Sequence, residues 1–126
     1  MSSTNPGAAV TTQTPLTAAM GNVSQEYVLS VTLSPAIVAA NTSAEQTFTV
    51  TGLALSDAVS VNKPTAQAGL GIVGARVSAA NTLAITFGNF TGLGITPTAS
   101  EAYLVKISRP IAQQLSNGLP SALPLS

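Results

Sequence analysis

The chain contains no cysteine, no histidine and no tryptophan. Without cysteine there are no disulfide bonds and no thiolate metal sites. Without histidine no imidazole can act as a general base or a metal ligand, so Ser-His-Asp and Cys-His catalytic arrangements are excluded. Carboxylate chemistry stays open, and it needs two acids that converge in the fold.

Charge is scarce as well, with four acidic and four basic residues and a formal net charge of zero. The acids, Glu26, Glu45, Asp57 and Glu101, lie in different segments, and isolated acids are usually solvated. We therefore predict that the chain is not an enzyme and has no catalytic residue, no cofactor and no metal site. Phosphate contacts need clustered lysine and arginine, so we also expect no nucleic acid and no acidic membrane as partner.

Long apolar runs are missing too. No run approaches the roughly 20 residues that span a bilayer. The first residues lack a basic region followed by an apolar core, so they do not resemble a secretory signal. We expect a soluble chain that is made in the cytoplasm without a signal peptide.

Small residues are abundant, with 30 serines and threonines and 20 alanines among 126 residues. The exterior is therefore expected to consist largely of hydroxyl and methyl groups. A surface with so few charges has little protection against association. This favours a subunit that is covered by neighbours in an assembly, and the alternative is an ordinary Ala/Thr-rich soluble domain.

Two alternating strands are predicted between Gly69 and Phe90, joined by the loop Ser78-Ala79-Ala80-Asn81. A period of two marks a strand that is half buried on a sheet. A strict period on the first strand places Leu70, Ile72 and Arg76 on one face. The same period places the following residues on the other face: Gly71, Val73, Ala75 and Val77.

Other alternating segments run over Val23–Leu33, Gln46–Thr51, Ala58–Asn62 and Glu101–Ser108. Tyr27 and Tyr103 fall on the apolar faces of their strands, which predicts core positions. Short strands separated by turn residues, with no long helix, indicate an all-β fold. We predict an antiparallel β-sandwich with jelly-roll or immunoglobulin-like Greek-key connections.

A short pattern recurs at an offset of 40 residues. Residues 39–42 and 79–82 are both Ala-Ala-Asn-Thr, and residues 51–53 and 91–93 are both Thr-Gly-Leu. In both places a loop precedes an alternating strand and then a glycine turn. We interpret this as the same loop-strand-turn chemistry used in two halves of a sandwich.

The predicted organisation is an extended N-terminal arm (1–22), a sandwich domain (23–109) and a C-terminal tail (110–126). Both end segments are uncharged and dotted with apolar residues. Each is either a disordered tail or an arm that orders against a neighbour. The two arginines of the sandwich are either polar interface residues or solvated strand ends. The interface candidates are Val10, Pro15, Leu16, Met20, Arg76, Arg109, Leu119, Leu123 and Leu125.

Several segments between Leu29 and Arg109 together resemble a known protein family. The likeness lies in residues 61–65, 69–72, 75–83, Phe87-x-Asn89, 95–97 and the strand 101–107. These resemble the small β-sandwich proteins that decorate, or cement, the capsids of tailed bacteriophages. The resemblance implies a structural protein on the outer capsid surface, made in the host cytoplasm. It also implies a homo-oligomer, a trimer by preference, whose terminal arms clamp neighbouring subunits of the major capsid protein and stabilise the shell.

The alternative is a phage fibre or adhesin-type sandwich that binds a host-surface glycan through its loops. Such a module is expected to carry aromatic and acidic residues in those loops. The long loops, residues 63–69 and 88–100, contain Phe90 as their single aromatic residue and no acid. The sequence therefore favours the decoration protein.

Overall fold

The structure is a computed structural model that describes residues 23–110. These residues form strands and connections, without a helix that is long and apolar enough to cross a membrane. The strands are β1 (Val23–Leu33), β2 (Thr42–Thr49), β3 (Ala58–Asn62), β4 (Leu70–Ala79), β5 (Thr82–Asn89) and β6 (Glu101–Pro110). The predicted all-β fold is confirmed, and β2 begins and ends earlier than the predicted Gln46–Thr51.

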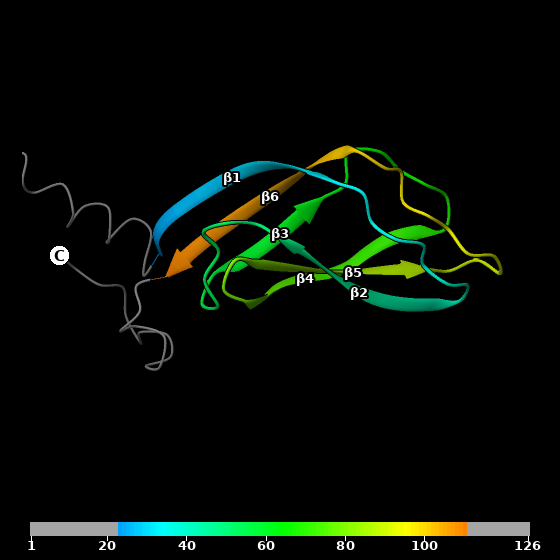
Figure 1. Cartoon of the computed structure of the whole chain (residues 1–126), viewed down its shortest axis with the longest axis horizontal. Helices are drawn as coiled ribbons and strands as arrows, with labels where there is room; N and C mark the ends of the chain where they lie inside the picture. Colours follow the sequence, from blue (N-terminus) through cyan, green and yellow to red (C-terminus); the bar gives the residue numbers. More distant parts are fainter. Residues whose placement is uncertain (1–22, 111–126) are drawn as a thin grey trace, which may run out of the picture. The chain divides into compact units, whose positions relative to one another are not determined.

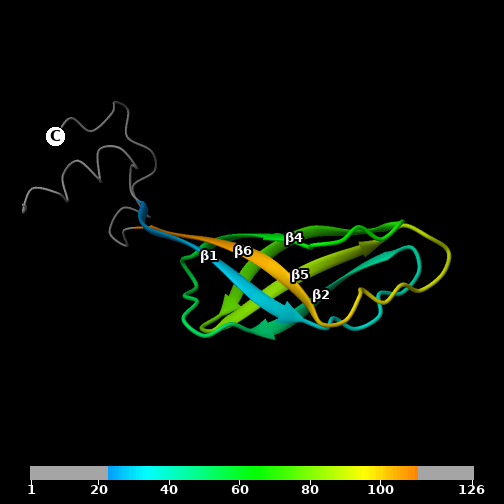
Figure 2. The same cartoon turned by 90° about the horizontal axis from the view of Figure 1, so that it is seen from above.

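The strands form two antiparallel three-stranded sheets, ordered β1-β6-β3 and β2-β5-β4 (Figures 1 and 2). Every connection except the β4–β5 hairpin crosses from one sheet to the other. The pairs β2–β5, β5–β4 and β3–β6 match the neighbours B–E, E–D and C–F of an immunoglobulin-like sandwich. The predicted antiparallel β-sandwich is therefore confirmed. Of the predicted N-terminal arm (1–22) and C-terminal tail (110–126), only Pro110 is described, as the last residue of β6, and the others lie outside the described residues.

Residues 26–108 form one compact unit, whereas the outer ends of β1 and β6 belong to a separate unit. The core of residues 26–108 lies between the sheets, because alternate side chains of each strand point to the same face. The inner faces of the two central strands contribute most of it. Their buried side chains are Leu83, Ile85 and Phe87 of β5, and Tyr103, Val105 and Ile107 of β6.

The predicted face of Arg76 is wrong, because β4 does not keep a strict period of two. The pairing of β4 with β5 shifts between Ile72 and Gly74. The bulged residue, Val73, is 61% exposed, and an extra residue of this kind swaps the faces of the residues that follow, here up to the second shift after Val77. Consequently Val77 pairs with the buried Leu83 and faces the core, whereas Arg76 lies on the outer face.

The hairpin loop between β4 and β5 is shorter than predicted. Ala79 still pairs with Thr82, which leaves Ala80 and Asn81 as the turn. Asn81 adopts a left-handed backbone with a φ of 60°, a conformation that asparagine tolerates better than most residues.

The 40-residue repeat has a structural counterpart. Asn41, the equivalent of Asn81, is also left-handed, with a φ of 53°. Each of the two asparagines immediately precedes a strand, and these strands, β2 and β5, pair with each other. Thr42 pairs with Asn89 and Thr49 with Thr82, so a shift of 40 residues exchanges the two pairs. The repeat therefore corresponds to a local pseudo-twofold arrangement about the β2–β5 pair.

The predicted core position of Tyr27 is also wrong, since its side chain is 42% exposed. Tyr27 lies on β1, an edge strand of its sheet. Its neighbours Val28 and Leu29 are 66% and 37% exposed. Alternation correctly places Tyr27 and Leu29 on one face of β1, but this part of the strand is not covered by the described residues of the opposite sheet.

Tyr103 is fully buried, as predicted, and its hydroxyl has no hydrogen-bond partner among the described residues. Burial raises the pKa of this phenol, and the negative charge of Glu101 raises it further. An unpaired buried hydroxyl costs about 1–3 kcal/mol. We expect Tyr103→Phe to raise the free energy of unfolding by about 1 kcal/mol, measured by urea denaturation. Tyr27→Phe, at an exposed tyrosine, is the control, and a destabilised Tyr103→Phe variant would contradict this account.

Candidate functional site

Most of the predicted interface residues lie outside the described residues. This applies to Val10, Pro15, Leu16, Met20, Leu119, Leu123 and Leu125. Their contacts stay predictions. Of the two described candidates, Arg109 is partly exposed near the end of β6, and its backbone carbonyl accepts a hydrogen bond of 3.0 Å from the Ser24 hydroxyl.

Arg76 is paired within the chain. Its Nε and Nη2 donate to the two carboxylate oxygens of Glu45, at 2.8 and 3.0 Å. The pair reaches from β4 to β2 across the central strand, where Ala84, opposite Arg76, is fully buried. The guanidinium hydrogen bonds lower the pKa of Glu45, and the same bonds raise the pKa of Arg76. Binding of Arg76 to a partner would have to compete with this bidentate contact.

A second ion pair closes the loop between β3 and β4. Lys63 Nζ lies 3.0 Å from Glu101 Oε1, and both side chains are only 10% exposed. The geometry is that of an ion pair without an aligned hydrogen bond, since Oε1 has no hydrogen-bond partner among the described residues. Thr65 donates its hydroxyl to Glu101 Oε2 and accepts a bond of 3.1 Å from Lys63. Glu101 therefore ties the loop 63–69 to the beginning of β6.

This arrangement predicts a pH-dependent stability. The Thr65 hydrogen bond, followed by Lys63, lowers the pKa of Glu101 below its ordinary value of 4.5. A carboxyl whose folded pKa is depressed stabilises the fold above its unfolded pKa, and this stabilisation is lost as the pH falls through the folded pKa. We expect Glu101→Gln to be less stable than the wild type at neutral pH.

The stability difference should shrink as the pH drops below 4.5, the ordinary value of this carboxyl. The measurement is urea denaturation of both proteins from neutral to acidic pH. Glu45→Gln is the control, because its ion pair is exposed and exposed pairs contribute little. A difference that does not vary with pH would show that the Glu101 charge is unimportant.

The main loops meet at one end of the sandwich. Residues 34–41, 63–69 and 90–100 follow β1, β3 and β5, and all lie at the right-hand end in Figure 1. Val38 and Ile95 exchange two backbone hydrogen bonds, of 2.8 and 3.0 Å, and Phe90 N–H donates to Gly69 at 2.8 Å. The opposite end holds Glu26 and Ser108, which are hydrogen bonded to each other.

Asn89 holds these loops together and is only 1% exposed. Its amide nitrogen donates to the carbonyls of Val38 and Leu93, at 3.0 and 2.7 Å. Its amide oxygen accepts from both the backbone N–H and the hydroxyl of Thr91, at 2.9 and 2.8 Å. Sequence reasoning missed this role. The one local sign of this role was the spacing Asn89-x-Thr91. The same spacing defines an N-glycosylation triplet, and several such triplets occur in this threonine-rich chain.

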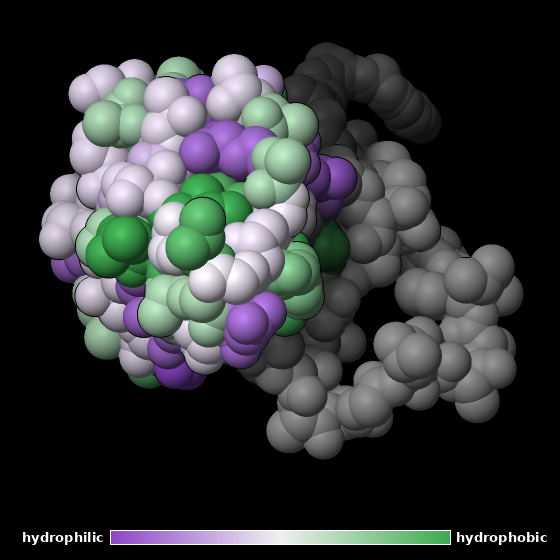
Figure 3. Space-filling view, turned by 90° about the vertical axis from the view of Figure 1, so that its right-hand side faces the viewer, coloured by the Kyte–Doolittle hydropathy of each residue, from purple (hydrophilic) through white to green (hydrophobic). Residues whose placement is uncertain are grey.

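The loop end exposes an apolar tip, which consists of Ile37, Phe90 and Leu93. Their side chains are 62%, 73% and 78% exposed. Figure 3, which views this end, shows hydrophobic residues near the centre of the face with more polar ones around them. The close packing beneath the tip requires glycine at two positions. A Cβ at Gly94 would lie 2.9 Å from Ile37, and one at Gly88 would lie 3.0 Å from the Phe90 ring.

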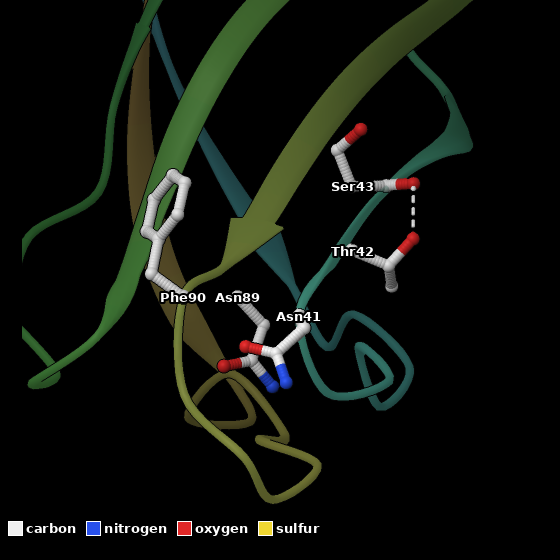
Figure 4. Close-up of a pocket in the computed structure, with 5 residues that line it drawn as sticks. All are labelled: Asn41, Thr42, Ser43, Asn89 and Phe90. Carbon is white, nitrogen blue, oxygen red and sulfur yellow. Dashed lines mark hydrogen bonds between the residues drawn. The ribbon is translucent and has the colours of Figure 1, made fainter.

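A shallow hollow of about 350 Å³ lies beside the tip. Its lining residues are Asn41, Thr42, Ser43, Asn89 and Phe90. Figure 4 shows Phe90 on one side of the end of β5, Thr42 and Ser43 on the other, and the two asparagines between them. The hollow thus combines the exposed Phe90 ring with the exposed Asn41 amide and the hydroxyls of Thr42 and Ser43, whereas the Asn89 amide is buried and already hydrogen bonded.

Comparison of the chain with protein-family models, curated proteins and solved structures gave no match. Within residues 23–110 there is no group of three or more acidic side chains placed to hold a metal ion. Three exposed features of residues 23–110 are suited to contact another molecule, namely the apolar tip, the hollow beside it and strand β1.

Proposed function

We propose that the chain is a structural virion protein that decorates a phage capsid and cements neighbouring subunits of the major capsid protein. The observation that supports this best is the apolar tip on hydrogen-bonded loops. Burying apolar surface contributes about 25 cal/mol per Å². Three large apolar side chains that project from one end are therefore suited to contact another protein.

The loops around the tip are ordered before any partner binds, because Asn89 and the Val38–Ile95 pair tie them together. A preordered surface loses less entropy on binding than a flexible one. The chain enters and leaves the unit 26–108 at Glu26 and Ser108, at the end opposite to the tip. In our proposal the tip contacts the capsid surface, and the terminal arms lock neighbouring subunits and raise shell stability by binding only the assembled state.

The experiment measures binding of the purified protein to shells of the major capsid protein of the same particle. We expect Phe90→Ser with Leu93→Ser to weaken binding by about tenfold or more, since each buried large apolar side chain contributes about 1.5–3 kcal/mol. Leu55→Ser is the matched control. Leu55 is 68% exposed but lies in the connection at the other end of the sandwich. Equal binding of both variants would exclude the tip as the contact surface.

The second candidate is a fibre or adhesin-type module that binds a host-surface glycan. The hollow beside Phe90 favours it, because sugar rings stack on exposed aromatic rings and their hydroxyls bond to amides and hydroxyls. A glycan array probed with the wild type and with Ser43→Trp separates the two functions. Ser43→Trp fills the hollow without replacing any of the three tip residues. Glycan binding that this variant loses would support the module, whereas shell binding that it retains would support the decoration protein.

A further inference from the structure

Among the described residues, strand β1 is the edge strand that carries none of the usual protections against pairing with another chain. Exposed edge strands are commonly shortened, bulged or covered. β3 has only five residues, and β4 has register shifts after Ile72 and after Val77. The segment after β1 is tied to β2, since the Gln46 amide bonds to both backbone groups of Ala36, at 2.8 and 2.9 Å. β1 has 11 residues, and β6 is its only strand partner among the described residues.

The exposed part of β1 carries three consecutive large apolar side chains, and only Val28 lies on the face that otherwise holds Glu26, Ser30 and Thr32. Tyr27 and Leu29 project from one face and Val28 from the other, and all three are more than a third exposed. On the neighbouring strand Leu104 is 48% exposed. Edge strands that face water normally carry charged residues. Residues 26–32 include one charged residue, Glu26. Its carboxylate accepts a hydrogen bond of 2.8 Å from Ser108 and lies 4.0 Å from Lys106.

We propose that β1 pairs antiparallel with β1 of a second copy about a twofold axis at Leu29. This joins two three-stranded sheets into one continuous sheet. Leu29 is the middle residue of the stretch from Glu26 to Thr32. The register places Tyr27 opposite Val31 of the second copy, an aromatic and β-branched pair that stabilises antiparallel sheets. This contact is independent of the proposed capsid function.

The register also keeps the acidic residues apart. Glu26 lies opposite Thr32 of the second copy, so the two Glu26 residues are six strand positions apart, or roughly 20 Å. Each carboxylate is already paired with Lys106 of its own chain. Like charges therefore do not oppose the association. A twofold contact gives an even number of copies, as a dimer or as two larger oligomers joined through β1.

Single-cysteine cross-linking tests this register, because the chain has no cysteine of its own. Directly opposed residues in an antiparallel pair have Cβ atoms about 4.5–5.5 Å apart, close to disulfide geometry. We expect Leu29→Cys to form a disulfide-linked dimer under mild oxidation. Thr32→Cys is the control on the same strand, because the twofold axis separates its two copies by roughly 20 Å. Equal cross-linking of the two variants would overturn the register.

Light scattering after size exclusion tests the contact itself in the full-length protein. We expect Val28→Lys to halve the mass, because a lysine on the edge disfavours strand addition. Val73→Lys is the matched control, since Val73 is a similarly exposed valine on β4. Thermal unfolding establishes that both variants are folded. A monomeric wild type, or a mass that Val28→Lys leaves unchanged, would overturn the proposal. So would a chain that dimerises only after deletion of residues 1–20, because its own arm would then cover β1.

Discussion

Asn89→Ala is expected to lower the free energy of unfolding by about 3 kcal/mol, because a buried side chain with four hydrogen bonds is lost. The Thr91 N–H would lose the amide oxygen that it bonds to at 2.9 Å. The carbonyls of Val38 and Leu93 would each lose one donor. Denaturation with guanidinium chloride measures the change.

Two further variants separate the role of Asn89 from general damage to the hollow. Ser43→Ala lines the same hollow but changes an exposed residue, so we expect a change within about 0.5 kcal/mol. Asn89→Asp keeps an acceptor for Thr91 and removes both donors, so it should also be destabilised. If Asn89→Ala were as stable as Ser43→Ala, the loops would not depend on Asn89. The apolar tip would then lack the ordered support that the proposed function assumes.

Gly69→Ala is the second change with a large expected effect, again about 3 kcal/mol of destabilisation. Gly69 has a φ of +80°, a backbone conformation that L residues rarely adopt. An added Cβ would also overlap the Thr91 methyl group, at 2.2 Å from Cγ2. Gly69 further accepts the Phe90 N–H, so a displaced loop would disturb the base of the apolar tip.

A double-mutant cycle separates the two causes. Thr91→Ser removes the overlapping methyl group and keeps the hydroxyl that bonds to Asn89. We expect Gly69→Ala to cost less by about 1–2 kcal/mol in the Thr91→Ser background, because only the backbone strain persists. If Gly69→Ala lowered the free energy of unfolding equally in both backgrounds, the overlap with the Thr91 methyl group would contribute nothing. Backbone strain would then explain the whole effect.

The strands were predictable because their alternation depends on local sequence, and the predicted Val23–Leu33 and Ala58–Asn62 match the structure. Faces were less predictable. One bulged residue, Val73, reverses the orientation of Arg76, and a bulge depends on how the neighbouring strand fits. Tyr27 alternates like a core residue, yet its exposure follows from the edge position of β1, which is set by strand order.

The candidate site was predictable only in part. Phe90 was identified as the single loop aromatic, and the structure places it in the apolar tip. The structural role of Asn89 depends on carbonyls of residues far away in sequence, such as Val38. Glu45 and Arg76 are 31 residues apart, and they meet because β2 and β4 flank the same central strand. No local pattern contains this information.

The most direct test of the central proposal is to add the purified full-length protein to capsid shells that lack it. The shells are assembled from the major capsid protein of the same particle. We predict saturable binding at a fixed ratio to the capsid subunit, together with a higher melting temperature of the shell. Removal of residues 1–20 should weaken both effects. An absence of saturable binding, with an unchanged shell melting temperature, would contradict the proposal and favour the glycan-binding module.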